Sequence, residues 1–315
     1  MAKIRIQSKR KQDLIFYIVM LAYPVLQFLI FYVGVNFNSI LMAFQYWSGS
    51  DGKIDNYTFF EGSKLLTNFI TFFDRFDESS GIAEVTLMGG YAFKNAFVAY
   101  FSALIITTPV SLIFSYYIFK KFPLSGMMKV VLFAPSVICG MALVTIYTQF
   151  VEVIIPEIIP NLEYGLLANP DTKFNTVLFF CIWLGFGGGI LLYVGAMNNI
   201  SDSVIEACKL DGANTFQEIW YIVLPLIYPT FVTFIVVGVG GIFTNQMALY
   251  SFFGEGKGIT PDLQTFGYWF FVKTKSARAD QYPELAAIGL LMTAIVAPAT
   301  LFVKWGLEKL GPKQL

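Results

Sequence analysis

The chain has 315 residues, of which 56% are hydrophobic and only 13% are charged, about half the charged fraction of an ordinary soluble domain. This composition argues against a water-soluble protein, and the balance of 21 basic and 21 acidic residues argues against binding of nucleic acid through bulk charge. The absence of histidine excludes imidazole chemistry, and three scattered cysteines are too few for a disulfide framework or a zinc site.

Six apolar runs without charged side chains lie at residues 14–35, 95–119, 130–151, 174–201, 219–254 and 285–303. A hydrocarbon core of about 30 Å needs about 20 helical residues, so each run is long enough to cross a bilayer. The runs lack the alternation of membrane β-strands. We therefore predict an all-α integral membrane protein, with residues 1–315 forming a single transmembrane domain. Its spans are expected at about 14–35, 95–119, 130–151, 174–197, 226–252 and 285–303.

The distribution of basic residues predicts the topology. An even number of spans places both termini on one side, and a cytoplasmic N-terminus puts 12 of the Lys and Arg residues inside and 9 outside. The segments before residue 14 and between 120 and 129 are short, flank the spans and are purely basic apart from Asp13, and in such segments the positive-inside rule has most weight. Both termini are therefore expected to be cytoplasmic.

The cytoplasmic segment between the fourth and fifth runs, about residues 198–225, departs from this rule because it is acidic. Residues 203–210 are compatible with a helix, and Asp211 and Gly212 form a strong turn signal. Asn214 or Thr215 is a suitable cap for a second helix, in which apolar residues recur at helical spacing. Pro225 is expected to end or kink that helix at the membrane. An amphipathic linker lying flat under the bilayer is an equal alternative on these grounds.

Residues of this segment resemble the "EAA" coupling loop in the membrane subunits of binding-protein-dependent ABC importers. The family pattern is approximately E-A-A-x-x-D-G-A, followed after about ten residues by an aliphatic residue and proline, before the last two spans. The matching residues are Glu206, Ala207, Asp211, Gly212, Ala213, Leu224 and Pro225. Cys208 stands where the family usually has alanine, and since both side chains are small the helix packing is expected to survive.

Less specific features resemble the carbohydrate branch of the same family. They are a basic N-terminus, Tyr23-Pro24 in the first span, Phe133-Ala134-Pro135 at the third and a glycine-rich stretch after Phe252. The resemblance implies the type I permease fold of ABC importers, in a prokaryotic plasma (inner) membrane. It also implies that the chain imports a sugar or oligosaccharide.

The partners implied by the resemblance are a second, homologous permease forming a heterodimer, two cytoplasmic ATPase subunits and an extracytoplasmic solute-binding protein. In the family the loop lies in a groove of the ATPase. By resemblance Glu206 pairs there with a basic residue while Gly212 permits the sharp turn. The chain has no phosphate-binding loop, so it is expected to hold no catalytic residue, metal or cofactor. ATP and Mg would be bound by the partner ATPase.

A sugar pathway needs polar and aromatic side chains on inward faces of the spans. The candidates within the apolar runs are Tyr147, Gln149, Trp183, Thr244, Asn245 and Gln246. Hydrogen bonding between neighbouring helices is an equal alternative for the amides. Glycines 185 and 187–189, beside Trp183, indicate either close helix approach or a broken helix along the path.

The sequence fits two other classes of membrane protein less well. An ion-coupled secondary transporter is the main alternative, but such proteins often carry ionisable residues within their spans, and six full spans can be drawn here without one. An intramembrane enzyme lacks its chemistry, because the runs contain no histidine, no carboxylate and no obvious Ser–Lys pair.

Overall fold

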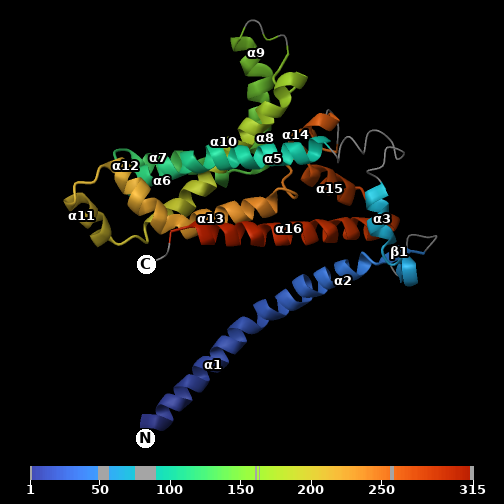
Figure 1. Cartoon of the computed structure of the whole chain (residues 1–315), viewed down its shortest axis with the longest axis horizontal. Coiled ribbons are helices and arrows are strands. Elements are labelled where there is room, and N and C mark those ends of the chain that lie inside the picture. The colour runs from blue at the N-terminus through green and yellow to red at the C-terminus, as the bar shows by residue number, and fades with distance from the viewer. Residues whose placement is uncertain are drawn as a thin grey trace. The chain divides into compact units, whose positions relative to one another are not determined.

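The computed structural model describes residues 2–48, 57–74, 90–159, 162, 164–255 and 259–312 (Figure 1). The chain divides into two compact units, each of which is considered by itself. The first consists of Met1–Asp74 with Ala277–Met292, and the second of Arg75–Ser276 with Thr293–Leu315.

The first unit is dominated by a long apolar helix. Its elements are α1 (Ala2–Gln27), the π-helical η1 (Phe28–Gly34), α2 (Val35–Met42), β1 (Gln45–Trp47), β2 (Tyr57–Phe59), the 3-10 turns η2 (Gly62–Lys64) and η9 (Ala279–Gln281), α3 (Thr67–Asp74) and the start of α16 (Tyr282–Leu310). Large apolar side chains between Leu14 and Phe37 are 44–74% exposed, as expected of a surface that faces lipid. The two short strands pair antiparallel, with Tyr46 opposite Thr58.

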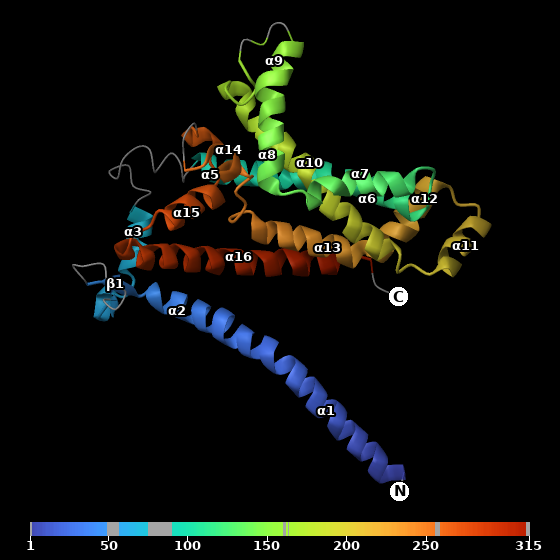
Figure 2. The same ribbon diagram turned by 180° about the vertical axis from the view of Figure 1, so that it is seen from behind.

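The second unit contains the other helices that the structure describes. They are α5 (Ala92–Ser102), η5 (Ala103–Thr107), α6 (Thr108–Phe119), α7 (Ser125–Val137), α8 (Gly140–Gln149), η6 (Phe150–Ile154), α9 (Ile155–Ile158), α10 (Pro170–Met197), α11 (Asp202–Leu210), α12 (Thr215–Glu218), η7 (Ile219–Val223), α13 (Leu224–Gly241), α14 (Leu249–Phe253), η8 (Pro261–Leu263), α15 (Phe266–Lys275) and the rest of α16. Of these, η5, η6 and η7 are π-helical. Helices α11 and α12 lie together at one end of α6, α7 and α13 (Figures 1 and 2).

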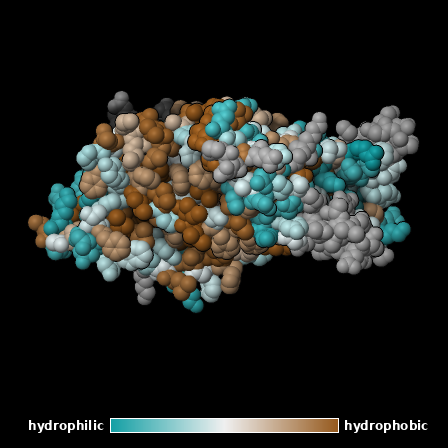
Figure 3. All heavy atoms as spheres, turned by 90° about the horizontal axis from the view of Figure 1, so that it is seen from above, coloured by the Kyte–Doolittle hydropathy of each residue, from teal (hydrophilic) through white to brown (hydrophobic). Residues whose placement is uncertain are grey.

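Six helical stretches within the described residues are long and apolar enough to cross a membrane, which confirms the predicted all-α fold with six spans. They are Asp13–Met42, Ala92–Phe119, Gly140–Ile158, Pro170–Met197, Thr215–Gly241 and Ala279–Leu310. Hydrophobic atoms cover the middle of the face shown in Figure 3, and hydrophilic atoms are frequent at its left end, where α11 lies. Four of the predicted spans fall inside these helices, namely 14–35, 95–119, 174–197 and 285–303.

The third span differs from the prediction of 130–151, because the helix breaks inside that run. Helix α7 ends at Val137, Ile138 and Cys139 adopt ψ angles of 143° and 126°, and α8 starts at Gly140. Pro135 removes a backbone donor from the last turn of α7, and β-branched Val137 and Ile138 follow it, so continuation of the helix is disfavoured. The membrane-length helix is instead 140–158.

The fifth span also differs, since the helix ends at Gly241 and does not continue to residue 252. The backbone N–H groups of Thr244 and Asn245 both donate to the Gly241 carbonyl, and the Asn245 side chain accepts from the N–H of Met247. Met247 and Ala248 then adopt φ angles of 50° and 55° before α14. Polar side chains that bond to the local backbone therefore turn the chain within a run that contains no charged residue.

Glycines hold α10 tightly between its two neighbours, and α10 is unbroken. A Cβ atom on Gly187 would lie 2.9 Å from the carbonyl oxygen of Leu132 in α7. On another face, Cβ atoms on Gly185 and Gly189 would lie 3.2 Å from the Thr107 methyl and 3.1 Å from the Ser111 hydroxyl. Of the two alternatives for this glycine-rich stretch, the structure shows close helix approach.

Candidate coupling loop and solute pathway

Helix α11 is amphipathic and short. Ile205 and Cys208, one turn apart, are buried, whereas Glu206 and Ala207 are exposed. Asp202 in its first turn and Lys209 in its last turn both favour the helix dipole. Cys208 is thus a small apolar side chain on the packed face, where alanine also fits.

Gly212 ends α11 through its backbone conformation. Its φ angle is +76°, and its N–H donates to the Lys209 carbonyl while the N–H of Ala213 donates to the Cys208 carbonyl. This pair of bonds is the Schellman arrangement, which needs a left-handed residue at the turn. No atom lies within 4 Å of a Cβ built on Gly212, so the requirement for glycine comes from the backbone and not from crowding.

A capping box starts the second helix. The Asn214 side chain accepts from the N–H of Gln217, and the Gln217 side chain accepts from the N–H of Asn214, each at 2.9 Å. The helix then continues through η7 into α13, so Pro225 lies inside a continuous helix, directly after the π-helical turn, and its missing N–H removes one intrahelical hydrogen bond there. Pro225 therefore does not end the helix, and the loop is joined to the fifth span without a break.

The loop exposes several large apolar side chains. Leu210 is 88% exposed, Phe216 71% and Trp220 56%. The rings of Phe216 and Trp220 stack with centroids 6.2 Å apart and planes 9° apart. The acidic side chains of Glu206 and Asp211 are exposed as well. Large exposed apolar side chains on a loop that also exposes charge are typical of a protein-docking surface.

Sequence reasoning did not find the contact that joins this loop to the rest of the second unit. Glu218, at the end of α12, is buried and forms an ion pair with Lys120, the residue that follows α6. In the sequence, Lys120 bears only on the topology, as one of the basic residues between the second and third runs. The available signal was the acidic character of the loop, because a carboxylate in an amphipathic helix at the membrane surface needs a nearby cation.

The candidate pathway residues fall into separate places. Tyr147 donates a hydrogen bond to the Thr176 carbonyl at 2.9 Å and lies 5.0 Å from the ring of Phe180, which in turn lies 6.0 Å from Trp183. Phe252 of α14 contacts both Tyr147 and Phe180 edge-on. Tyr147 and Trp183 therefore belong to one aromatic cluster formed by α8, α10 and α14.

The polar residues Thr244 and Asn245 lie in the turn after α13, and Gln246 follows them. The Thr244 hydroxyl donates to the Gly241 carbonyl, and the Asn245 carbonyl accepts from the Thr265 hydroxyl at 2.9 Å. Gly267 permits this approach, since a Cβ there would lie 2.6 Å from the Thr244 carbonyl. Gln149 is exposed at the end of α8. The side chains of Thr244 and Asn245 thus bond to the backbone of their own turn and not to a neighbouring helix.

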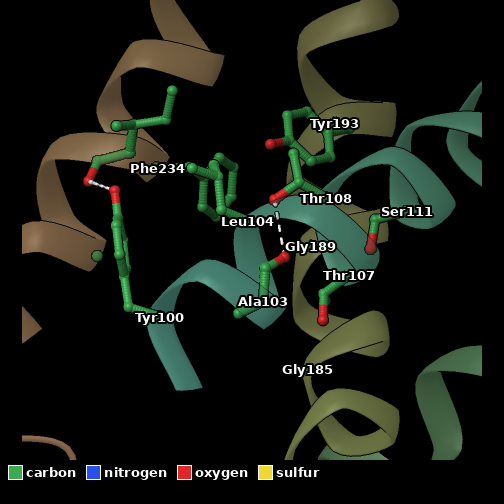
Figure 4. Close-up of a pocket in the computed structure, with 12 residues that line it drawn as sticks. Tyr100, Ala103, Leu104, Thr107, Thr108, Ser111, Gly185, Gly189, Tyr193 and Phe234 are labelled. Atoms are coloured by element: carbon green, nitrogen blue, oxygen red, sulfur yellow. Dashed lines mark hydrogen bonds between the residues drawn. The ribbon is translucent and has the colours of Figure 1, made fainter. Parts of the chain in front are cut away.

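The structure also contains a pocket of about 240 Å³ that the sequence did not reveal (Figure 4). It lies between α5–α6, α10 and α13 and is lined by Tyr100, Ala103, Leu104, Thr107, Thr108, Ser111, Gly185, Gly189, Tyr193, Phe234, Ile235 and Gly238. The hydroxyl oxygens of Thr107 and Ser111 are buried there without a hydrogen-bond partner. Because the Ser111 hydroxyl and the Thr107 methyl lie against Gly189 and Gly185 of α10, the pocket lies along the contact of η5 and α6 with α10.

These features define a six-span membrane protein with a helix–turn–helix loop that is continuous with its fifth span. Residues 108–314 match the family described as "Binding-protein-dependent transport system inner membrane component". The chain belongs to this family.

Curated relatives share part of this sequence. The multiple sugar-binding transport system permease protein MsmF of Streptococcus mutans is 23% identical over 169 residues, covering 52% of this chain and 57% of the relative. The probable starch degradation products transport system permease protein AmyC of Thermoanaerobacterium thermosulfurigenes is 27% identical over 189 residues, covering 58% and 66%. These alignments span between about half and two thirds of each relative.

A solved structure shares the fold over almost the whole chain. It is that of a bacterial ABC transporter involved in the import of the acidic polysaccharide alginate, with a TM-score of 0.69 and 18% sequence identity. The match covers 97% of this chain and 99% of the other. This likeness establishes the permease fold of an ABC importer. The family match and the six candidate spans make the chain a multi-pass membrane protein.

Proposed function

We propose that the chain is the permease subunit of an ATP-driven importer that takes a sugar or oligosaccharide from an extracytoplasmic binding protein and passes it to the cytoplasm. The observation that carries this proposal is the loop at 202–225. It exposes the stacked Phe216–Trp220 pair as well as Glu206 and Asp211, and it joins the fifth span without a break. Sugar or starch-product transport in the names of relatives supports the solute class.

The loop performs docking and force transfer. ATP and Mg bind to the partner ATPases, whose closure displaces the docked loop as a rigid body. Glu206 pairs with a basic ATPase residue. The small side chains of Ala207 and Ala213 allow the ATPase to approach the backbone of the loop closely. Gly212 and Asp211 fix the angle between α11 and α12. Leu224 and Pro225 start the span that receives the displacement.

The pathway uses aromatic surface for sugar rings and polar groups for their hydroxyls. Tyr147 and Trp183 supply the aromatic surface through the cluster around Phe180. Gln149 and Gln246 supply amide groups. Thr244 and Asn245 shape the turn after α13.

Glu152 lies inside the third membrane-length helix, where an ion-coupled transporter would place a functional carboxylate. Here its carboxylate accepts from the N–H groups of Leu167 and Ala168 at 2.6 and 3.1 Å. These hydrogen bonds hold the segment at Leu167 and Ala168 against η6, so they favour a structural role for the Glu152 carboxylate.

Assembly and import test the proposed function directly. The full chain is expressed with a candidate second permease, ATPase and binding protein from the same genome, purified in detergent and reconstituted into vesicles. We expect the ATPase to co-purify and ATP to drive uptake of the sugar held by the binding protein. Purification of the intact chain without any ATPase, together with uptake driven by an ion gradient alone, would instead establish a secondary transporter.

Topology gives a second prediction. In a variant with its three native cysteines replaced by serine or alanine, Lys209→Cys is expected to resist a membrane-impermeant maleimide in intact cells and to react after permeabilisation. Ser276→Cys, also exposed but on the other predicted side, should react in intact cells. Labelling of position 209 from outside would place the loop on the wrong face for an ATPase and contradict the proposal.

A further inference from the structure

A buried ion pair attaches the loop to the turn between α6 and α7. The Lys120 ammonium donates to both carboxylate oxygens of Glu218, at 2.6 and 2.8 Å. The two side chains are only 15% and 5% exposed, whereas those of the ion pairs Lys275–Glu255, Arg278–Asp280 and Lys304–Glu308 are at least 45% exposed. Since removing charges from water is costly unless both are held closely, this pair fixes the distance between α12 and the end of α6.

The pair lies beside a shared apolar core. The Lys120 ammonium lies 5.7 Å from the ring centroid of Tyr116, and Tyr116 is buried in one cluster with Tyr193 and Met197 of α10, Val223 of η7 and Ile227 of α13. Apolar contacts in such a cluster are non-directional and permit sliding, whereas a two-point hydrogen-bonded ion pair sets direction and register. The polar link therefore adds a directional attachment at the edge of a contact that is otherwise apolar.

The turn that carries Lys120 is continuous with a tightly packed group of helices. Lys121 and Leu124 have φ angles of 53° and 62°, so the chain reverses sharply between α6 and α7. Both of these helices pack against α10, through the close contacts at Gly187 and Gly189 described above. A displacement applied at residue 120 is consequently applied to α6, α7 and α10 together, because a densely packed interface moves as a unit.

We propose that the Lys120–Glu218 ion pair is a positioning element that transmits movement of the docked loop to the α6–α7–α10 group. The proposal rests on the function proposed for the loop. Through η7 the loop moves α13, and through this ion pair it moves the helices on the other side of the pocket shown in Figure 4. Because Glu218 is buried within the chain, it acts without touching the ATPase.

The test compares solute imported per ATP hydrolysed in the reconstituted transporter. Glu218→Gln and Lys120→Met are expected to lower this ratio by about 5- to 150-fold, the range typical of coupling between sites, while the ATPase still co-purifies. The charge-reversed pair Lys120→Glu with Glu218→Lys is expected to recover most of the ratio. Glu308→Gln, which breaks an exposed ion pair with Lys304, is the matched control and should leave the ratio unchanged.

Two results would overturn the proposal. The first is that Glu218→Gln imports as much solute per ATP hydrolysed as the wild-type transporter does. The other is a charge-reversed variant that reaches the membrane at normal levels, binds the ATPase and still imports no better than the single variants, since the ion pair would then serve folding alone. Failure of the proposed function has a different signature, because in that case the wild-type chain itself binds no ATPase.

Discussion

Replacing Glu206 with lysine is expected to abolish sugar import while leaving the chain in the membrane. Glu206 is exposed on α11, so the substitution removes no packing within the chain. If it pairs with a basic ATPase residue, the lysine places like charges together at a docked surface, a change that costs about 2–5 kcal/mol when the lost pair is desolvated. At 1.4 kcal/mol for each factor of ten, ATPase affinity would fall by more than about tenfold.

The measurement is ATPase co-purification together with ATP-driven uptake, and Asp13→Lys is the control. Asp13 is also an exposed acid, at the cytoplasmic end of the predicted first span, so its reversal changes the net charge equally without touching the loop. Both variants should accumulate in the membrane to wild-type levels. Normal uptake by Glu206→Lys would refute docking through this face of α11.

Replacing Gly187 with alanine is expected to destabilise the helix group around α10. The new methyl group would lie 2.9 Å from the Leu132 carbonyl oxygen, a backbone atom that moves only if α7 moves. Overpacking of this kind costs about 1–3 kcal/mol of unfolding free energy. The apparent melting temperature of the purified chain in detergent should therefore fall, and import should fall with it.

Gly188→Ala provides a control from the adjacent residue of the same helix. A Cβ at Gly188 has no atom within 4 Å, and replacing glycine in a helix with alanine stabilises by about 0.5–1 kcal/mol. Its melting temperature is expected to stay level or rise. Equal losses in both variants would mean that the glycines serve flexibility and not helix contact.

The sequence could predict the spans because the bilayer imposes a length on every apolar helix. It could not predict where helices end inside an apolar run, since those ends depend on local bonds. The break at Ile138–Cys139 follows Pro135 and a pair of β-branched residues, and the end of α13 depends on Asn245 and its backbone partners. Hydropathy averages over such residues and extends the span past them.

The turn and the helix cap of the loop could be predicted from the sequence, but the ion pair that joins the loop to α6 could not. Gly212 and Asn214 act on residues within five positions of themselves, so their effects can be inferred from spacing alone. Lys120 and Glu218 lie 98 positions apart in the chain, and only the packing of α6 against α10 and η7 brings them together. The same applies to Tyr147 and Trp183, whose shared cluster depends on the break before α8.

The π-helical segment η7 makes one part of the chain tolerant of changes in length. A π turn bonds residue i to i+5, one residue more than an α turn, so losing one residue from Ile219–Val223 would convert it to an α turn with α13 still in register. The same deletion inside α10 would rotate everything beyond it by about 100° and move its glycines off their partners. The loss of one residue between the loop and the fifth span is thus absorbed at η7, whereas α10 requires a constant length.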